Sequence, residues 1–221
     1  MDATDYLHEL IAEGEHLHQD FKFAISDARK IARSLSAFAN TGGGRLLVGV
    51  KDNGRIAGVR SEEEMYMIEA AASLYCRPAA EIHTYIYKVE GKDVLVVEIP
   101  EHAVKPVCAV DEEGKAWAYV RVADENILAN AVHLNIWKHE RQETEVVMTY
   151  TEQEQRLLDV LGQRGALSLN QCAKVMGTDR RSLCQLLADF IRFGLVEQVF
   201  TGHRFHYRLR TSATDLPPDE P

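Results

Sequence analysis

The sequence predicts an α+β fold, in which helices flank a mixed and mostly antiparallel sheet, followed by a small second domain. The apolar run Leu46–Val50 follows three glycines and is typical of a strand covered on both faces. Short apolar segments separated by turn residues between positions 82 and 122 indicate further strands. Beyond residue 150 the pattern changes to three helical segments and a hairpin. Before residue 139 the expected order of elements, β-α-ββ-α-ββ-β-β-α, is that of an α+β domain.

The elements of this first part follow from apolar spacing and turn residues. Ser26 is expected to cap a helix with Asp27 in its first turn, and Asn40 and Thr41 to end that helix before the glycines. The segment Asp52-Asn53-Gly54 has hairpin-turn composition, since Asn and Gly tolerate positive φ. The expected helices are 4–14, 26–39, 62–76 and 126–138, and the expected strands are 15–23, 46–50, 56–59, 82–89, 94–99, 107–110 and 116–122.

The remainder predicts a second domain of different character. We expect residues 1–138 to form the first domain, 139–150 a polar linker, 151–210 the second domain and 211–221 a mobile acidic tail. The second domain is expected to contain helices at 152–161, 168–176 and 180–193, and strands at 195–199 and 204–209 around Thr201-Gly202. Three helices followed by a β-hairpin are typical of a winged helix.

Composition narrows the class of protein. The chain has 221 residues, of which 46% are hydrophobic, so one or two folded domains are expected. It contains no apolar run of about 18 residues, and its acidic N-terminus lacks the form of a signal peptide. The four cysteines are scattered without a CxxC pair, which favours reduced thiols in a cytoplasmic protein.

Charge is distributed unevenly along the chain. The net charge is −9; residues 1–150 hold 16 basic and 25 acidic side chains, whereas residues 151–210 hold nine and six. The tail adds three acids. Because proteins that bind duplex DNA usually present a basic surface, only the segment 151–210, at +3, favours that partner.

Several motifs carry a family resemblance. Asp20-Phe21-Lys22 precedes the segment 37–59, in which Ala-Phe-Ala-Asn-Thr ends a helix, three glycines lead into a strand, and a turn follows it. Lys105-Pro106 and Tyr119-Val120-Arg121 come later in the chain. Together these motifs resemble the AlbA-type domain of the Schlafen family, also called divergent AAA, over about residues 15–121. The resemblance implies a bacterial transcriptional regulator that binds DNA.

The same resemblance implies three candidate catalytic acids, Glu15, Asp20 and Asp52, with Lys22 beside them. Schlafen proteins that cut RNA use acids at the matching positions, and clustered acids bind Mg²⁺ or Mn²⁺ and activate water. The chain departs from the pattern, because the second acid is Asp rather than Glu and Lys51 replaces the first Asp of a pair. In a regular strand Glu15 and Asp20 would point to opposite faces, so Glu15 must lie on a bend. The alternative is that these are solvated acids at strand ends.

Two further groups in this region have a structural and a functional interpretation. Asn40, Thr41, Gly42, Gly43 and Gly44 form either a structural turn or a phosphate contact made by exposed backbone N–H groups. No Walker motif is present, so ATP binding is not expected. The predicted strand places His16 and His18 on one face with Asp20, which suits either a metal site or exposed histidines.

The predicted winged helix carries candidate DNA contacts. Arg180, Arg181 and Ser182 begin its recognition helix, the end that enters the major groove in this architecture. Arg204 and Arg208 lie on the wing, where they would contact backbone phosphates. The alternative is a winged helix that mediates only protein contacts.

We therefore expect a cytoplasmic DNA-binding transcriptional regulator, which forms a homodimer, contacts no membrane and requires no cofactor. Its first domain would act as a sensor, an oligomerisation module or a nucleic-acid platform. The first alternative is a nuclease for RNA or single-stranded DNA that uses Glu15, Asp20 and Asp52 with Mg²⁺ or Mn²⁺. The second alternative is a dimeric interaction scaffold.

Overall fold

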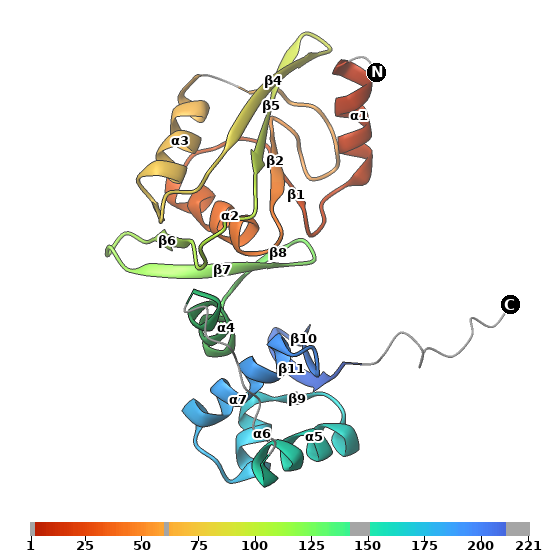
Figure 1. Cartoon of the computed structure of the whole chain (residues 1–221). Helices are drawn as coiled ribbons and strands as arrows, with labels where there is room; N and C mark the ends of the chain where they lie inside the picture. The colour runs from red at the N-terminus through yellow and green to blue at the C-terminus, as the bar shows by residue number, and fades with distance from the viewer. Residues whose placement is uncertain (1–2, 60–61, 142–150, 211–221) are drawn as a thin grey trace, which may run out of the picture. The chain divides into compact units, whose positions relative to one another are not determined.

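The computed structural model of the chain describes residues 3–59, 62–141 and 151–210. It divides into two compact units, Met1–Ala129 and Asn130–Pro221, called here the N-terminal and C-terminal units (Figure 1). Both contain helices and sheets, and β1–β2 is the one parallel pair among the strand pairs of the described residues. The predicted α+β class with mostly antiparallel sheets is confirmed.

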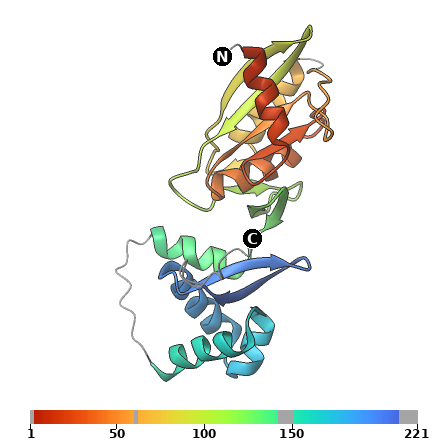
Figure 2. The same cartoon turned by 90° about the vertical axis from the view of Figure 1, so that its right-hand side faces the viewer.

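The first sheet of the N-terminal unit has the order β1-β2-β5-β4. Its strands are β1 (Gln19–Lys22), β2 (Gly44–Val48), β5 (Lys92–Ile99) and β4 (His83–Val89). Leu46 and Val48 pack into a core with α2 (Ala28–Asn40) and α3 (Glu62–Ser73), whereas Leu47 packs into a second core with α1 (Ala3–Glu13). Figure 2 shows α1 lying across its face of this sheet. Burial on both faces explains the uninterrupted apolar run of β2.

A second sheet has the order β3-β6-β7-β8. Its strands are β3 (Cys76–Arg77), β6 (Cys108–Val110), β7 (Ala116–Val122) and β8 (Glu125–Leu128). Helix α2 contacts both sheets, since Leu35 and Phe38 share one core with Leu46 of the first sheet and Ala109 of the second. Helix α2 is therefore the element that joins the two sheets of this unit.

Two predicted strands and one predicted helix cap of the N-terminal unit differ in the structure. The predicted strand 15–23 is reduced to β1, because His16 and Gln19 close a tight turn through two backbone hydrogen bonds. The predicted strand 56–59 is a single bridge between Val50 and Ile56. The cap of α2 is Asp27 rather than Ser26, because Asp27 has an extended backbone and its side chain accepts from the backbone N–H groups of residues 29 and 30.

The C-terminal unit consists of α4 (Ala131–Arg141), α5 (Glu152–Arg164), β9 (Leu167–Ser168), α6 (Leu169–Met176), α7 (Arg180–Arg192), β10 (Val196–Thr201) and β11 (Arg204–Leu209). Its three-stranded sheet has the order β10-β11-β9. Helices α5 and α6 each begin with a capping box, formed by Thr151 with Glu154 and by Ser168 with Gln171. The core lies between α5, α6, α7 and the sheet, and contains Leu157, Leu161, Cys172, Leu183, Leu187, Phe190 and Tyr207.

The boundary between the units falls earlier than the sequence predicts. The predicted helix 126–138 is split, because residues 125–128 pair with β7 as β8 and the helix begins only at Ala131. Val132 of α4 is fully buried in the core of the C-terminal unit, so α4 belongs there and not to a domain ending at residue 138. Residues 139–141 of the predicted linker are the last turn of α4. The rest of that linker, 142–150, and the tail 211–221 lie outside the described residues.

None of the helices among the described residues is long and apolar enough to cross a membrane.

Candidate functional site

Two of the three candidate acids meet at the start of β1. Glu15 lies on a bend before β1, as the sequence required if its side chain was to meet that of Asp20. Its Oε1 accepts from the backbone N–H of Phe21 at 3.0 Å. Burial raises the pKa of Glu15, and a hydrogen bond with the Asp20 side chain raises it further. The neighbouring Asp20 carboxyl group therefore disfavours the ionised form of Glu15.

Asp20 is almost fully buried and lies between two cations. Lys22 Nζ lies 2.6 Å from Asp20 Oδ2, and Arg121 Nη2 lies 3.6 Å from Asp20 Oδ1. The contact with Lys22 is an ion pair without hydrogen-bond alignment, since Oδ2 has no hydrogen-bond partner among the described residues. The charge of Asp20 is thus compensated inside the protein.

The third acid does not join this pair. Asp52 is exposed, in the turn between Val50 and Ile56. Among the described residues, no group of three or more His, Cys, Asp or Glu side chains is arranged to hold a metal ion. The histidines have other partners: His16 pairs with Glu13 at 3.3 Å, and the His18 ring contacts the carbonyl of Gly43 at 2.8 Å.

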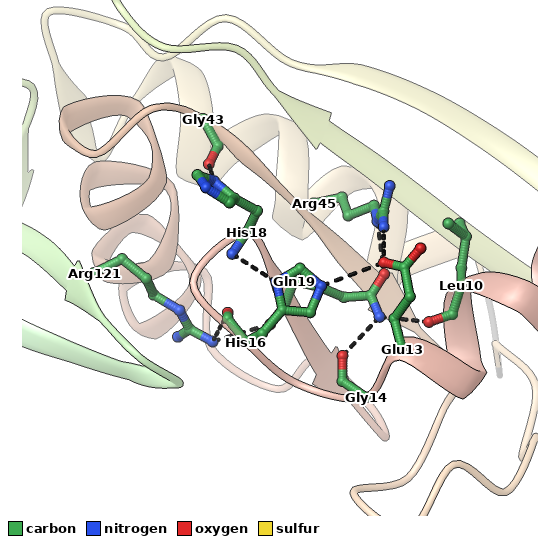
Figure 3. Close-up of polar contacts among 9 residues, drawn as sticks. All are labelled: Leu10, Glu13, Gly14, His16, His18, Gln19, Gly43, Arg45 and Arg121. Carbon is green, nitrogen blue, oxygen red and sulfur yellow. Dashed lines mark hydrogen bonds and ion pairs between the residues drawn. The ribbon is translucent and has the colours of Figure 1, made fainter. Parts of the chain in front are cut away.

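Figure 3 shows a polar network centred on Gln19, next to Asp20 in β1. Gln19 is fully buried, and its Nε2 donates to the carbonyls of Leu10 at 2.5 Å and Gly14 at 2.8 Å. Its Oε1 accepts from Arg45 Nε at 2.6 Å, and Arg45 also pairs with Glu13. Gln19 therefore ties the end of α1 to β2. Alternation along the segment 15–23 places Gln19 on the face of Phe21, but no local pattern predicts the distant groups that satisfy its amide.

Arg121 of β7 reaches from the second sheet into the turn before β1. Its Nη2 donates to the carbonyl of Gln19 at 3.1 Å and its Nη1 to Asn126 Oδ1 at 2.9 Å, while the guanidinium lies 4.9 Å from the centre of the Phe38 ring. The side chain is 1% exposed. Together with the ion pair to Asp20, these contacts make Arg121 the clamp between the two sheets. The family motif contained this arginine, but its role required the tertiary structure.

The candidate turn after α2 is held by its own side chains. Asn40 donates to the carbonyls of Val107 and Tyr119, both at 2.9 Å, and accepts from the backbone N–H of Val107 at 2.9 Å. Thr41 Oγ1 accepts from the backbone N–H of Arg121 at 3.1 Å. Both side chains thus join α2 to the second sheet.

The glycines of this turn are required by geometry. Gly43 has a φ of +76°, and a Cβ there would lie 2.9 Å from the carbonyl oxygen of Ile99. A Cβ on Gly44 would collide with the Phe38 ring. Gly42 donates its backbone N–H to the carboxylate of Glu101, whose pKa is lowered chiefly by its hydrogen bond with Lys105. A carboxylate of the protein itself therefore occupies the Gly42 N–H group.

The five candidate DNA contacts of the C-terminal unit fall into two groups. Arg180 and Arg181 are exposed on the first turn of α7, and Arg204 is exposed at the start of β11. Ser182 Oγ donates to Asp179 Oδ2 at 2.6 Å, and Arg208 Nε pairs with Glu197 Oε1 at 2.6 Å. Arg180, Arg181 and Arg204 therefore remain accessible. The side chains of Ser182 and Arg208 already have partners within the protein.

Comparison with known proteins assigns the N-terminal unit. The family model described as "Schlafen, AlbA_2" matches residues 15–130. The chain belongs to the Schlafen AlbA_2 family. The match covers the acids, the glycine turn and Arg121, and it ends where the C-terminal unit begins. The expected family resemblance is confirmed over this range.

Among solved structures, the chain is similar to the DIP2311 protein of Corynebacterium diphtheriae, with 19% identity over 73% of this chain and 39% of that one, at a TM-score of 0.43. It is also similar to the N-terminal domain of a RecG-related protein from Nitrosomonas europaea, with 25% identity over 69% of this chain and 97% of that domain, at a TM-score of 0.41. The chain thus spans about two fifths of DIP2311. No curated protein matches the chain.

Proposed function

We propose that this protein is a DNA-binding transcriptional regulator, in which the C-terminal unit reads duplex DNA as a winged helix. The observation that supports this best is the pair Arg180 and Arg181, both exposed on the first turn of α7. Side chains at the start of a recognition helix are the ones that reach base edges and phosphates in the major groove.

The surrounding elements are those that such a reader needs. Helix α6 ends at Gly177 in a left-handed conformation, and α7 begins three residues later, which gives the helix-turn-helix order. The hairpin β10–β11 follows and would serve as the wing, with Arg204 next to its tip. The segment 151–210 carries a net +3 within a chain of −9, so charge favours this unit as the DNA-contacting one.

The Schlafen AlbA_2 domain would support DNA binding as a platform or an oligomerisation module. A single small domain of +3 binds duplex DNA weakly, and paired half-sites are commonly read by dimers. We therefore include a homodimer in the proposal. Light scattering of the full chain at micromolar concentration should give twice the mass of one chain, and a monomer would reject this part.

The test of DNA binding uses the full chain and duplex DNA of mixed sequence over a range of salt concentrations. Arg180→Ala/Arg181→Ala should weaken binding and lower the slope of log affinity against log salt by about 2, since each phosphate contact contributes about 0.9. The matched control is Arg164→Ala/Lys174→Ala, which removes the same charge from exposed positions of α5 and α6. Equal affinity of the wild type and the α7 variant contradicts the proposal.

A second candidate is a nuclease that requires Mg²⁺ or Mn²⁺. The contact between Glu15 and Asp20, next to Lys22, favours it, because a divalent cation relieves repulsion between paired carboxylates. Purified protein would be incubated with structured RNA and single-stranded DNA, with Mn²⁺ or with chelator. This candidate expects metal-dependent cleavage that Glu15→Gln or Asp20→Asn abolishes without unfolding the protein. Absence of cleavage, or cleavage that survives both substitutions, rejects it.

A further inference from the structure

The first sheet of the N-terminal unit ends in two edge strands of different character. Its order is β1-β2-β5-β4, so β1 and β4 each have one neighbour within the sheet. Strand β1 has four residues and is mostly buried, whereas β4 has seven residues and is exposed from His83 to Ile86. An edge strand presents a row of backbone N–H and C=O groups to any chain that can pair with it. What occupies these groups therefore decides which edge is open to a partner.

The β1 edge is closed by side chains of the protein itself. The backbone N–H of Phe21 donates to Glu15 Oε1 at 3.0 Å, and the carbonyl of Phe21 accepts from Lys22 Nζ at 2.9 Å. The carbonyl of Gln19 accepts from Arg121 Nη2 at 3.1 Å. These contacts satisfy backbone groups along β1 and leave little of its edge for another strand.

The β4 edge has no comparable closure. Among the described residues, the backbone of residues 83–89 makes no main-chain hydrogen bond outside its pairing with β5. Within the same ranges, β4 is also the longest strand at the edge of a sheet. Natural edges are protected by prolines, bulges or several charges, whereas β4 pairs with β5 without a bulge, lacks proline and carries one lysine. Strand β4 is therefore a surface on which another strand can pair.

The side chains along this edge are apolar or aromatic on both faces of the sheet. The pairing with β5 places Tyr85 and Tyr87 on the face covered by α1, and Ile86 on the face covered by α2. Tyr85 is 46% exposed and Ile86 is 60% exposed. Tyr87 is positioned by Tyr6 of α1, whose ring centre lies 5.7 Å from its own. A strand added at this edge would thus bury apolar surface on both faces as well as backbone groups.

The sequence of β4 is complementary to its own antiparallel copy. A two-fold axis perpendicular to a sheet pairs a strand with its copy and keeps opposite residues on the same face. The middle residue of β4 is Ile86, so overlap of the whole strand brings Ile86 opposite Ile86 of the second copy. In this register Tyr85 lies opposite Tyr87, and Lys88 lies opposite Thr84. Apolar residues meet apolar residues, aromatic rings meet aromatic rings, and no like charges face each other.

We propose that β4 pairs antiparallel with β4 of a second copy of this chain, across a two-fold axis at Ile86. The pairing joins two four-stranded sheets into one continuous sheet. A second copy fits this edge better than an unrelated strand, because full overlap matches the side chains on both faces and sets no two lysines against each other. The inference rests on the homodimer of the proposed function and assigns the surface that forms it.

The first test measures the dissociation constant of the dimer by analytical ultracentrifugation of the full chain. Ile86→Lys sets two lysines opposite each other at the axis and should raise this constant at least about tenfold. The matched control is Leu74→Lys, which makes the same change at a position outside β4 that is 65% exposed, and should stay within about twofold. Circular dichroism checks that both variants are folded. An unchanged constant in Ile86→Lys, or an equal rise in the control, overturns the proposal.

The second test determines the register with a short thiol-specific cross-linker. Chains carrying Thr84→Cys and chains carrying Lys88→Cys are mixed, each with Cys108→Ser, because the other three native cysteines are buried. The mixture should give covalent dimers, since opposite residues have Cβ atoms about 5 Å apart. Each variant alone should give few, because its two cysteines would be four residues out of register, about 13 Å apart. Equal cross-linking in the mixture and in the separate samples overturns the proposal.

Failure of this interface is distinguishable from failure of the proposed DNA contact. Arg180→Ala/Arg181→Ala should leave the dissociation constant of the dimer unchanged, whatever its effect on duplex binding. A dimeric wild type that Ile86→Lys does not weaken overturns the β4 interface and leaves the homodimer to another surface. A monomeric wild type overturns both the homodimer and this inference, and leaves the β4 edge to a strand of another protein.

Discussion

The two units use polar side chains in opposite ways. In the N-terminal unit, the motif residues Asp20, Asn40 and Arg121 are buried and bonded to one another or to backbone. In the C-terminal unit the buried side chains of the described residues are apolar apart from the Tyr207 hydroxyl, two thiols and the partly buried His133, and Arg180 and Arg181 are exposed. A family motif thus marks structural residues in one unit, whereas unpaired surface charge marks candidate contacts in the other.

The physical reason lies in the cost of burying polar groups. A buried charge without a partner is strongly unfavourable, so each polar residue that enters the N-terminal unit requires further polar partners. An exposed arginine has no such requirement and is available to a ligand. Substitutions should therefore affect folding in the first unit and binding in the second, and the following changes are ordered by expected effect.

The largest effect is expected for Arg121→Ala. It removes the clamp between the two sheets and leaves the buried Asp20 with Lys22 as its one cationic partner among the described residues, which should cost about 3–5 kcal/mol of folding free energy. Hydrogen exchange followed by mass spectrometry should show the loss of protection in residues 3–129 only. Arg55→Ala, at an exposed position, is the control and should change stability by at most about 0.5 kcal/mol. A small effect of Arg121→Ala would show that the network is not structural.

Gly43→Val should cost about 3 kcal/mol in the same unit. A side chain there combines backbone strain at φ +76° with a clash against the carbonyl of Ile99. Gly114→Val separates the two effects, because Gly114 has a φ of +77° but no heavy atom within 4 Å of the added Cβ. Urea unfolding should give a smaller loss for Gly114→Val. Equal losses would mean that the close approach of β5 to the glycine turn is unimportant.

In the C-terminal unit, His133 should make stability fall in acid. Burial lowers its pKa from 6.5 to about 4, so the unfolded state takes up a proton first as pH falls. Its contribution is fully present above pH 6.5 and is lost by about pH 4, which amounts to about 3 kcal/mol. His133→Gln should flatten this dependence in urea unfolding followed by Trp137 fluorescence, whereas His203→Gln, at an exposed position, should not.

Glu15 should give the smallest effect, and its contribution to folding stability should fall as pH rises, opposite to that of His133. Its pKa is raised above 4.5, so the folded state holds the proton more tightly than the unfolded state. Its contribution is present below pH 4.5 and is lost as pH rises through the raised value. Glu15→Gln should therefore gain stability relative to the wild type between pH 4.5 and neutrality, measured by urea unfolding, with Glu9→Gln as control. A pH-independent difference would exclude the contact with Asp20 as its cause.

Local rules predicted most of the elements but not the partners of the polar residues. The spacing of Leu183, Leu186, Leu187 and Ile191 and the cap Thr151 located α5, α6 and α7 to within three residues at either end, whereas the start of α4 was placed five residues too early. The turn at Gln19 and the strand β8 were missed, because both depend on pairing with distant segments. For the candidate site, the alignment located Glu15 on a bend but could not predict that Asp52 stays apart.

The sequence by itself determined the α+β class, the Schlafen AlbA_2 motifs, the left-handed glycine turn and the charge contrast between the two parts of the chain, because each depends on composition or on neighbouring residues. Tertiary structure alone decided that Arg121 clamps Asp20, that α4 packs in the C-terminal unit, and that the Trp117 indole donates to Asp111. These contacts join residues far apart in the chain, and no local pattern specifies which buried charge or aromatic ring a distant side chain will meet.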